Sequence, residues 1–264
     1  MSESPGNILD QNQPGTASPA GQAFSGMQYL DAYAYVFGSP NWVMNVILGA
    51  VCQLIPIIGP MVLMGYQFDI IESLQRDPRG SYPDFCFDRF ADYLKRGLWP
   101  FLVSFIVNAI VIVPVALVCY VIGLVVSLAS HGAGQHVGPV VAFVGMGGCS
   151  LLFMALLIAV GFVSLPMWLR AGLTQDFAEA FRLDFVRDFI RTIWKEMLLT
   201  ALFLFGTSLV VTTAGMLLCC VGIYPAGALV MLAIAHLNYQ LYQAYLSRGG
   251  MPIPVKSTVA SQLR

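Results

Sequence analysis

The sequence predicts an all-α protein built as a polytopic bundle of transmembrane helices. Of its 264 residues, 58% are hydrophobic and 10% are charged, whereas soluble domains have roughly 45 to 50% apolar and about 25% charged residues. Asp, Glu, Lys and Arg are absent from three long runs, 32–68, 97–169 and 197–247. A helix needs about 20 apolar residues to cross the hydrocarbon core of a bilayer, so these runs together have room for about five crossings.

The two ends of the chain have a different composition. Residues 1–25 are rich in Ser, Gly, Pro, Gln and Asn and have few aliphatic side chains, so they cannot bury enough apolar area to offset the entropy of ordering. We expect a disordered tail over 1–25 and a flexible C-terminal tail over 247–264. The transmembrane helical domain is then expected to cover 26–246.

Polar and helix-breaking residues inside the uncharged runs place the crossings. A glycine-containing polar segment at 130–136 divides the second run, and Gly222 with Pro225 divides the third. Charged connectors at 67–97 and 169–196 separate the runs. We therefore predict five helices, near 42–66, 98–129, 138–168, 197–219 and 223–246.

The first run allows two arrangements. The segment Ile-Pro-Ile-Ile-Gly-Pro at 55–60 lies in the middle of the expected helix, and two prolines with a glycine can either kink a helix or break it into a re-entrant hairpin. A kinked crossing gives five crossings in total, and a re-entrant hairpin gives four crossings plus a dip. We favour the kinked crossing.

The basic residues indicate which side each loop faces. Five of the 13 Lys and Arg residues lie in 67–97, five lie in 169–196 and three lie in 247–264. The positive-inside rule places these three segments on the cytoplasmic side, so the C-terminus is expected to be cytoplasmic. The loop around 131–136 and the turn at Gly222 then face outward.

The two connectors contain similar nonapeptides, at 87–95 and 183–191. Both have Asp at their second and sixth positions and a basic residue at the ninth. Apolar residues recur every three or four positions in each, which is typical of an amphipathic helix at a membrane interface. We predict an internal repeat, although two juxtamembrane helices can also converge on one pattern. Because the charges of each connector nearly cancel, we expect solvated, salt-bridged outer faces.

A few strongly polar side chains lie within otherwise apolar sequence. They are Asn45, Gln53, Asn108, His236 and Asn238. Such groups can line a polar pathway or join helices by hydrogen bonds. A lone histidine without an acidic partner is a poor proton relay, so we favour the contacts between helices.

Motifs of catalysis are absent from the sequence. It has no His-Glu-x-x-His, Gly-x-Ser-x-Gly or Walker-type motif, no cysteine and histidine spacing typical of zinc, and no basic stripe suited to nucleic acid. We therefore expect no enzyme activity, catalytic residue, cofactor, metal or nucleic-acid partner. The expected partners are the lipid bilayer and either a second protein or a second copy, bound through the cytoplasmic connectors.

The order of the motifs resembles a known family. The 55–60 segment, then Gly65 and Tyr66, a charged amphipathic connector, Pro-Asp-Phe at 83–85 and a long apolar hairpin are similar to bacterial and archaeal multi-pass membrane proteins that are described only as a domain of unknown function. The likeness covers roughly 28–246. It implies a prokaryotic inner-membrane location and supplies no activity or substrate.

Two functions fit these expectations. The first is binding or scaffolding within the membrane without catalysis. The alternative is a passive permease or channel for a small neutral or polar solute, lined by Asn45, Gln53, Asn108 and His236.

Overall fold

The computed structural model describes residues 26–132, 134–217 and 221–256, and within these ranges it contains helices and no strand. The predicted all-α class is therefore confirmed for the described residues, while the predicted disordered tail at 1–25 lies outside them. The elements in chain order are α1 (Tyr29–Phe37), α2 (Trp42–Gln53), α3 (Ile58–Arg76), the 3-10 helix η1 (Phe87–Arg89), α4 (Phe90–Gly132), α5 (Gly134–Thr174), α6 (Phe177–Ala180), α7 (Leu183–Leu217) and α8 (Ile223–Ser247).

Helices α3 and α8 form the centre of the packed part of the molecule. Helix α8 contacts α1, α2, α3 and α7, and most residues in its second half are buried. Helix α3 crosses α4 at two glycines: a Cβ on Gly65 would lie 1.9 Å from the carbonyl oxygen of Tyr93, and one on Gly97 would lie 1.7 Å from that of Met61. Small residues allow such close approach of two helix backbones, so these glycines fix where α3 meets α4.

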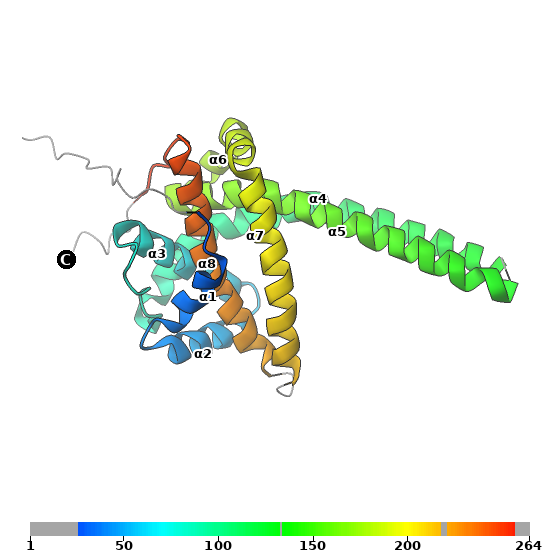
Figure 1. Cartoon of the computed structure of the whole chain (residues 1–264), viewed down its shortest axis with the longest axis horizontal. Coiled ribbons are helices and arrows are strands. Elements are labelled where there is room, and N and C mark those ends of the chain that lie inside the picture. The colour runs from blue at the N-terminus through cyan, green and yellow to red at the C-terminus, as the bar shows by residue number, and fades with distance from the viewer. Residues whose placement is uncertain (1–25, 133, 218–220, 257–264) are drawn as a thin grey trace, which may run out of the picture.

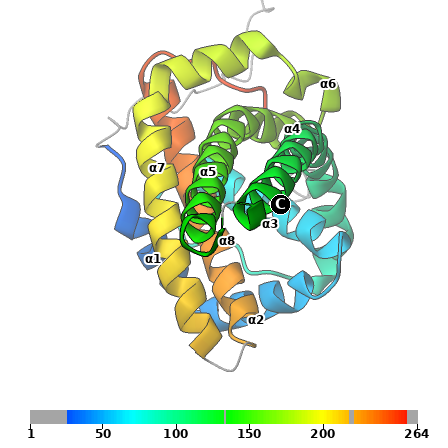
Figure 2. The ribbon, with the colours of Figure 1, turned by 90° about the vertical axis from the view of Figure 1, so that its right-hand side faces the viewer.

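Helices α4 and α5 form a long antiparallel hairpin that extends away from the other helices. Figures 1 and 2 show that it runs across the direction of α7 and α8. Among the residues between 104 and 159 whose burial is described, Gly138 alone is buried. Pro100 in α4 and Pro166 in α5 lie close to the point where the hairpin leaves the packed helices.

The predicted single helix over 42–66 is wrong. Helix α2 ends at Gln53 and α3 begins at Ile58, because Pro56 lacks an N–H group and its ring would clash with the carbonyl four residues earlier in a continuous helix. Ile57 has a φ of 67°, which β-branched residues rarely adopt. Helix α3 then continues to Arg76, well into the segment that was expected to be a connector.

Three described helices are long and apolar enough to cross a membrane. They lie within Phe87–Ser130, Gly138–Thr174 and Leu183–Leu217, and a fourth span is possible if α1 and α2, which are bent by 99°, count as one broken span. Helix α8 is not among them, since it carries polar residues in its second half. The count of five crossings and the internal repeat stay predictions.

The amphipathic segments are continuous with the apolar helices. Residues 87–95 form η1 and the first turns of α4, and residues 183–191 form the first turns of α7. Only the second segment is set off by a break, because Ile193 has non-helical dihedral angles. The expected separate interfacial helices are therefore the beginnings of long helices.

The described part of the C-terminal tail is packed in place. Ile253 is buried, and its amide donates to the hydroxyl of Tyr242 at 2.8 Å. The Lys256 amide donates to the Leu173 carbonyl at 2.9 Å. Residues 250–256 therefore contact α5 and α8, while the flexibility of the tail stays a prediction. Residues 257–264 lie outside the described part.

Candidate functional site

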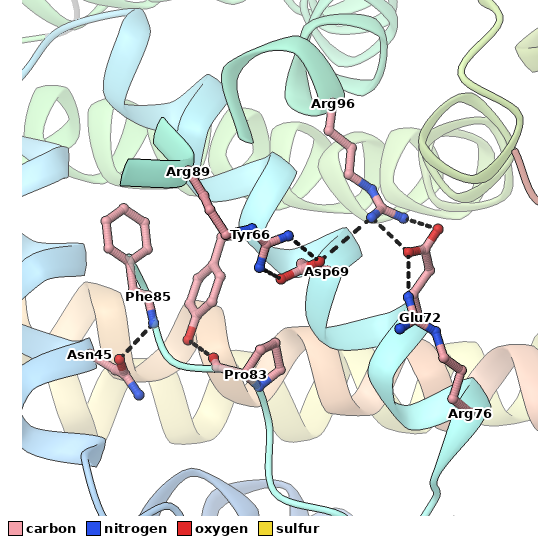
Figure 3. A network of polar contacts seen from close by, with 9 residues as sticks. All are labelled: Asn45, Tyr66, Asp69, Glu72, Arg76, Pro83, Phe85, Arg89 and Arg96. Atoms are coloured by element: carbon pink, nitrogen blue, oxygen red, sulfur yellow. Dashed lines mark hydrogen bonds and ion pairs between the residues drawn. The ribbon is translucent and has the colours of Figure 1, made fainter. Parts of the chain in front are cut away.

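A cluster of charged side chains lies where α3 meets the start of α4 (Figure 3). Arg89 donates two hydrogen bonds to Asp69, at 2.8 and 3.0 Å, which is the bidentate geometry that arginine and a carboxylate favour. The Nη1 atom of Arg96 lies 2.9 Å from an oxygen of Glu72 and 3.8 Å from one of Asp69. Arg76 reaches the same Glu72 carboxylate at 3.2 Å.

The inner members of this charge cluster are buried. The side chains of Glu72 and Arg96 are each 5% exposed and that of Asp69 is 11% exposed, whereas that of Arg76 is 64% exposed. A buried charge is costly unless it is paired, and these carboxylates are paired with guanidinium groups. The charge cluster therefore holds α3, η1 and α4 together.

The spacing of the residues explains how the charge cluster forms. Asp69 and Glu72 are three residues apart and share one face of α3, while Arg89 and Arg96 are seven apart, about two helical turns. The close crossing of α3 and α4 brings the two faces together. Because both carboxylates accept hydrogen bonds from arginine, their role here is to join α3 to η1 and α4 through ion pairs.

A second polar network holds the loop between α3 and η1. Asn45 donates to Asp84 at 3.1 Å and accepts from the Phe85 amide at 2.9 Å, and Tyr66 donates to the Pro83 carbonyl at 2.8 Å. Asn41 donates to the other oxygen of Asp84 at 2.6 Å. The hydrogen bonds from Asn41 and then Asn45 hold the pKa of Asp84 below its ordinary value.

Two of the other predicted polar residues make contacts within or between helices. The Gln53 side chain donates to the Tyr224 carbonyl at 3.1 Å and so joins α2 to the start of α8. Asn108 donates to the Ser104 carbonyl of its own helix at 2.7 Å. Asn45, Gln53 and Asn108 thus contact three separate parts of the chain: the loop before η1, α8 and α4.

The two remaining predicted residues lie in α8. The ring of His236 stacks on that of Tyr35, with centroids 4.5 Å apart, and its Nδ1 atom lies 3.1 Å from the amide nitrogen of Gln240. Asn238 is buried at 6% exposure. The His236 side chain thus lies at the contact between α8 and α1.

The second connector carries its own ion pairs at the same end of the molecule. Arg170 pairs with Glu179 and packs over the ring of Phe185, 5.0 Å from its centroid. The Arg170 guanidinium lowers the pKa of the Glu179 carboxyl. Gln175 donates to the Arg96 carbonyl at 3.2 Å. This hydrogen bond joins the end of the first connector to the beginning of the second.

Sequence reasoning missed the charge cluster. It placed the connector charges on solvated outer faces, which is wrong for Asp69, Glu72 and Arg96. The available signal was the spacing of Asp69 and Glu72, which share one face of α3, with apolar residues on its other faces. Those residues are Phe68, Ile70, Ile71 and Leu74. The same pattern is typical of a helix with a solvated charged face, so the local sequence does not show that these charges are buried.

Side chains of the metal-ligating types do not cluster in the described ranges. No group of three or more His, Cys, Asp or Glu side chains in those ranges could hold a metal ion. The charged groups that are buried there serve to join helices.

A family model described as "Protein of unknown function (DUF4013)" matches residues 48–220. The chain belongs to this family. The match includes α3 and both connectors, and therefore the whole charge cluster; it confirms the resemblance to a family of unknown function. Neither a curated protein nor a solved structure matches the chain.

Proposed function

We propose that this DUF4013 protein is a multi-pass protein of a prokaryotic inner membrane that binds or organises partners there without catalysing a reaction. The observation that carries the proposal is the apolar surface of the α4–α5 hairpin. Its exposed side chains include Phe105 at 62%, Ile110 at 68%, Phe143 at 81% and Leu151 at 75%. An apolar surface of this extent needs lipid or another protein against it.

The placement of charge supports a sidedness for the hairpin. The hydrogen bond between Gln175 and the Arg96 carbonyl joins the two connectors, which carry ten of the 13 Lys and Arg residues, at the base of the hairpin. The Lys256 amide is bonded to Leu173 beside them. The positive-inside rule favours this end in the cytoplasm. The C-terminus then lies in the cytoplasm and the tip of the hairpin outside.

The α4–α5 hairpin must change its direction if it crosses the same membrane as α7 and α8. Helices that cross one membrane together are nearly parallel, because each follows the membrane normal. The α4–α5 hairpin instead runs across the direction of α7 and α8 (Figure 1). Pro100 and Pro166 lie at the foot of the hairpin, and each removes a helical hydrogen bond there. We propose that the hairpin bends at these prolines in a bilayer and aligns with α7 and α8.

The connectors offer the surface for a protein partner. Phe87, Phe181 and Leu183 are exposed and lie among charged residues near the starts of α4 and α7. Exposed apolar residues rimmed by charges are typical of protein interaction sites. A second protein or a second copy of the chain would bind here.

Labelling with a membrane-impermeant maleimide tests the topology. Single cysteines at Ser130, Val221 and Met251 would be introduced into a variant in which the native cysteines are replaced by serine. We expect labelling of intact cells at Ser130 and Val221, and labelling at Met251 only after permeabilisation. Protection of Ser130 in intact cells would overturn the crossing of the α4–α5 hairpin.

Photocrosslinking tests the binding role. A photoreactive residue at Leu183 should give one discrete protein adduct, whereas the same residue at Leu202, which is 54% exposed on the apolar part of α7, should contact lipid only. Two results together would overturn the scaffold in favour of a permease. They are a solute flux in liposomes that is abolished by His236→Leu and by Asn108→Leu, and the absence of an adduct at Leu183.

A further inference from the structure

A polar pocket of about 300 Å³ lies beside α7, at the point where its charged first part gives way to its apolar second part. Thr192, Trp194, Lys195 and Glu196 line it together with Arg248 from the end of α8. The uncharged run begins at residue 197, so the pocket lies at the boundary between the charged and the apolar parts of the chain. Tryptophan favours this level of a membrane protein.

The break in α7 lies beside the pocket. Ile193 has the non-helical dihedral angles φ −130° and ψ 25°, and the carbonyl of the residue before it, Thr192, faces Arg248. Arg248 donates to this carbonyl at 2.7 Å and to Glu196 at 3.1 Å. One guanidinium thus caps the break and neutralises the carboxylate in the pocket.

The pocket retains one positive charge. Lys195 and Arg248 supply two cations and Glu196 supplies one anion. The Nζ atom of Lys195 lies 5.7 Å from the centroid of the Trp194 ring, and the side chain of Arg248 is 44% exposed. With Arg248 paired to Glu196, Lys195 is the cation in the pocket that can contact a phosphate group, and the exposed indole beside it can contact the apolar chain that carries the phosphate.

We propose that this pocket binds the phosphate of an anionic phospholipid headgroup. The proposal rests on the proposed membrane location, since a lipid reaches the pocket only if residue 197 marks the membrane surface. The net charge of the connector as a whole is close to zero, whereas the net charge of the residues that line this pocket is positive. Basic pockets between helices on the cytoplasmic side are known headgroup sites.

Native mass spectrometry of the purified full-length protein tests the proposal. The protein would be titrated with phosphatidylglycerol or phosphatidylcholine, and in a separate arm with inorganic phosphate. A lysine near a phosphate contributes about fivefold in affinity, so Lys195→Gln should weaken retention of phosphatidylglycerol about fivefold and leave phosphatidylcholine unchanged.

Lys95→Gln is the matched control. Lys95 is exposed and lies two residues before the uncharged run that starts at 97, as Lys195 lies two residues before the run at 197, and the change in net charge is the same. Lys195→Gln leaves the pair of Arg248 with Glu196 in place, and an unchanged melting temperature would show that it folds. Retention of phosphatidylglycerol by Lys95→Gln should equal that of the unsubstituted protein.

Two results would overturn the proposal. Equal weakening by both substitutions would show general attraction of the anionic lipid rather than a site. Binding of inorganic phosphate alone, with the same dependence on Lys195, would assign the pocket to a soluble anion. Either result leaves the labelling pattern at Ser130 unaffected, so failure of the pocket is distinguishable from failure of the proposed function.

Discussion

Replacing Arg96 with methionine tests whether the charge cluster stabilises the fold. Arg96→Met leaves the Glu72 carboxylate, whose side chain is 5% exposed, without its buried partner at 2.9 Å. Removing one member of a buried ion pair costs about 3 to 5 kcal/mol, and the remaining bond from Arg76 reduces the loss toward the lower end. A loss of about 3 kcal/mol lowers the melting temperature of a chain of this size by roughly 6 to 12 °C.

The assay is thermal unfolding in detergent, followed by the loss of helical circular dichroism. Arg76→Met is the matched control: it removes the same charge from the same carboxylate, but the Arg76 side chain is 64% exposed, so we expect a loss below about 1 kcal/mol. Combining Arg96→Met with Glu72→Met should restore most of the stability, because an apolar pair can replace a buried ion pair. Equal shifts for Arg96→Met and Arg76→Met would refute the reasoning.

Three further measurements test other parts of the structure. The pKa of Asp84 is lowered in the folded state, so the stability that its carboxylate contributes is complete above the ordinary pKa of about 3.9 and is lost as the pH falls through the folded pKa. Asp84→Asn should therefore lower the free energy of unfolding by less than about 1 kcal/mol at pH 7. A difference between the variant and the unsubstituted protein that persisted at pH 2 would contradict this. Gly97→Ala should destabilise the crossing of α3 and α4 by about 1 to 3 kcal/mol, because its Cβ would lie 1.7 Å from a carbonyl oxygen of α3. Gly123→Ala is the control and should cost nothing, because Gly123 has open space around it. Similar melting temperatures for the two variants would disprove the close crossing. The Sγ atom of Cys149 lies 4.0 Å from the carbonyl oxygen of Cys119, and the two thiol side chains also interact with each other. A thiol oxidant such as copper phenanthroline should therefore form a disulfide within one chain. Peptide mapping that finds Cys119 linked only between chains would contradict the register of the hairpin.

The break between α2 and α3 shows how far sequence reasoning could reach. The two prolines and the glycine at 55–60 identified the position of the disruption correctly, but a kink and a complete break have the same local signal. The outcome depends on how α3 packs against α4 and α8 after the break. The same reasoning therefore misplaced residues 67–76, which continue α3 instead of forming a connector.

The sequence by itself determined the helical, membrane-compatible class of the protein, because the length of an uncharged run is a local property that the chain carries whatever its tertiary structure. The tertiary structure alone decided that Asp69 and Glu72 are buried and paired with Arg89 and Arg96. These partners are 20 and 24 residues apart, and burial of a charge depends on which helices cover it. An unpaired charge in that interior would cost several kcal/mol, so each carboxylate needs a partner. The crossing of α3 and α4 supplies the arginines.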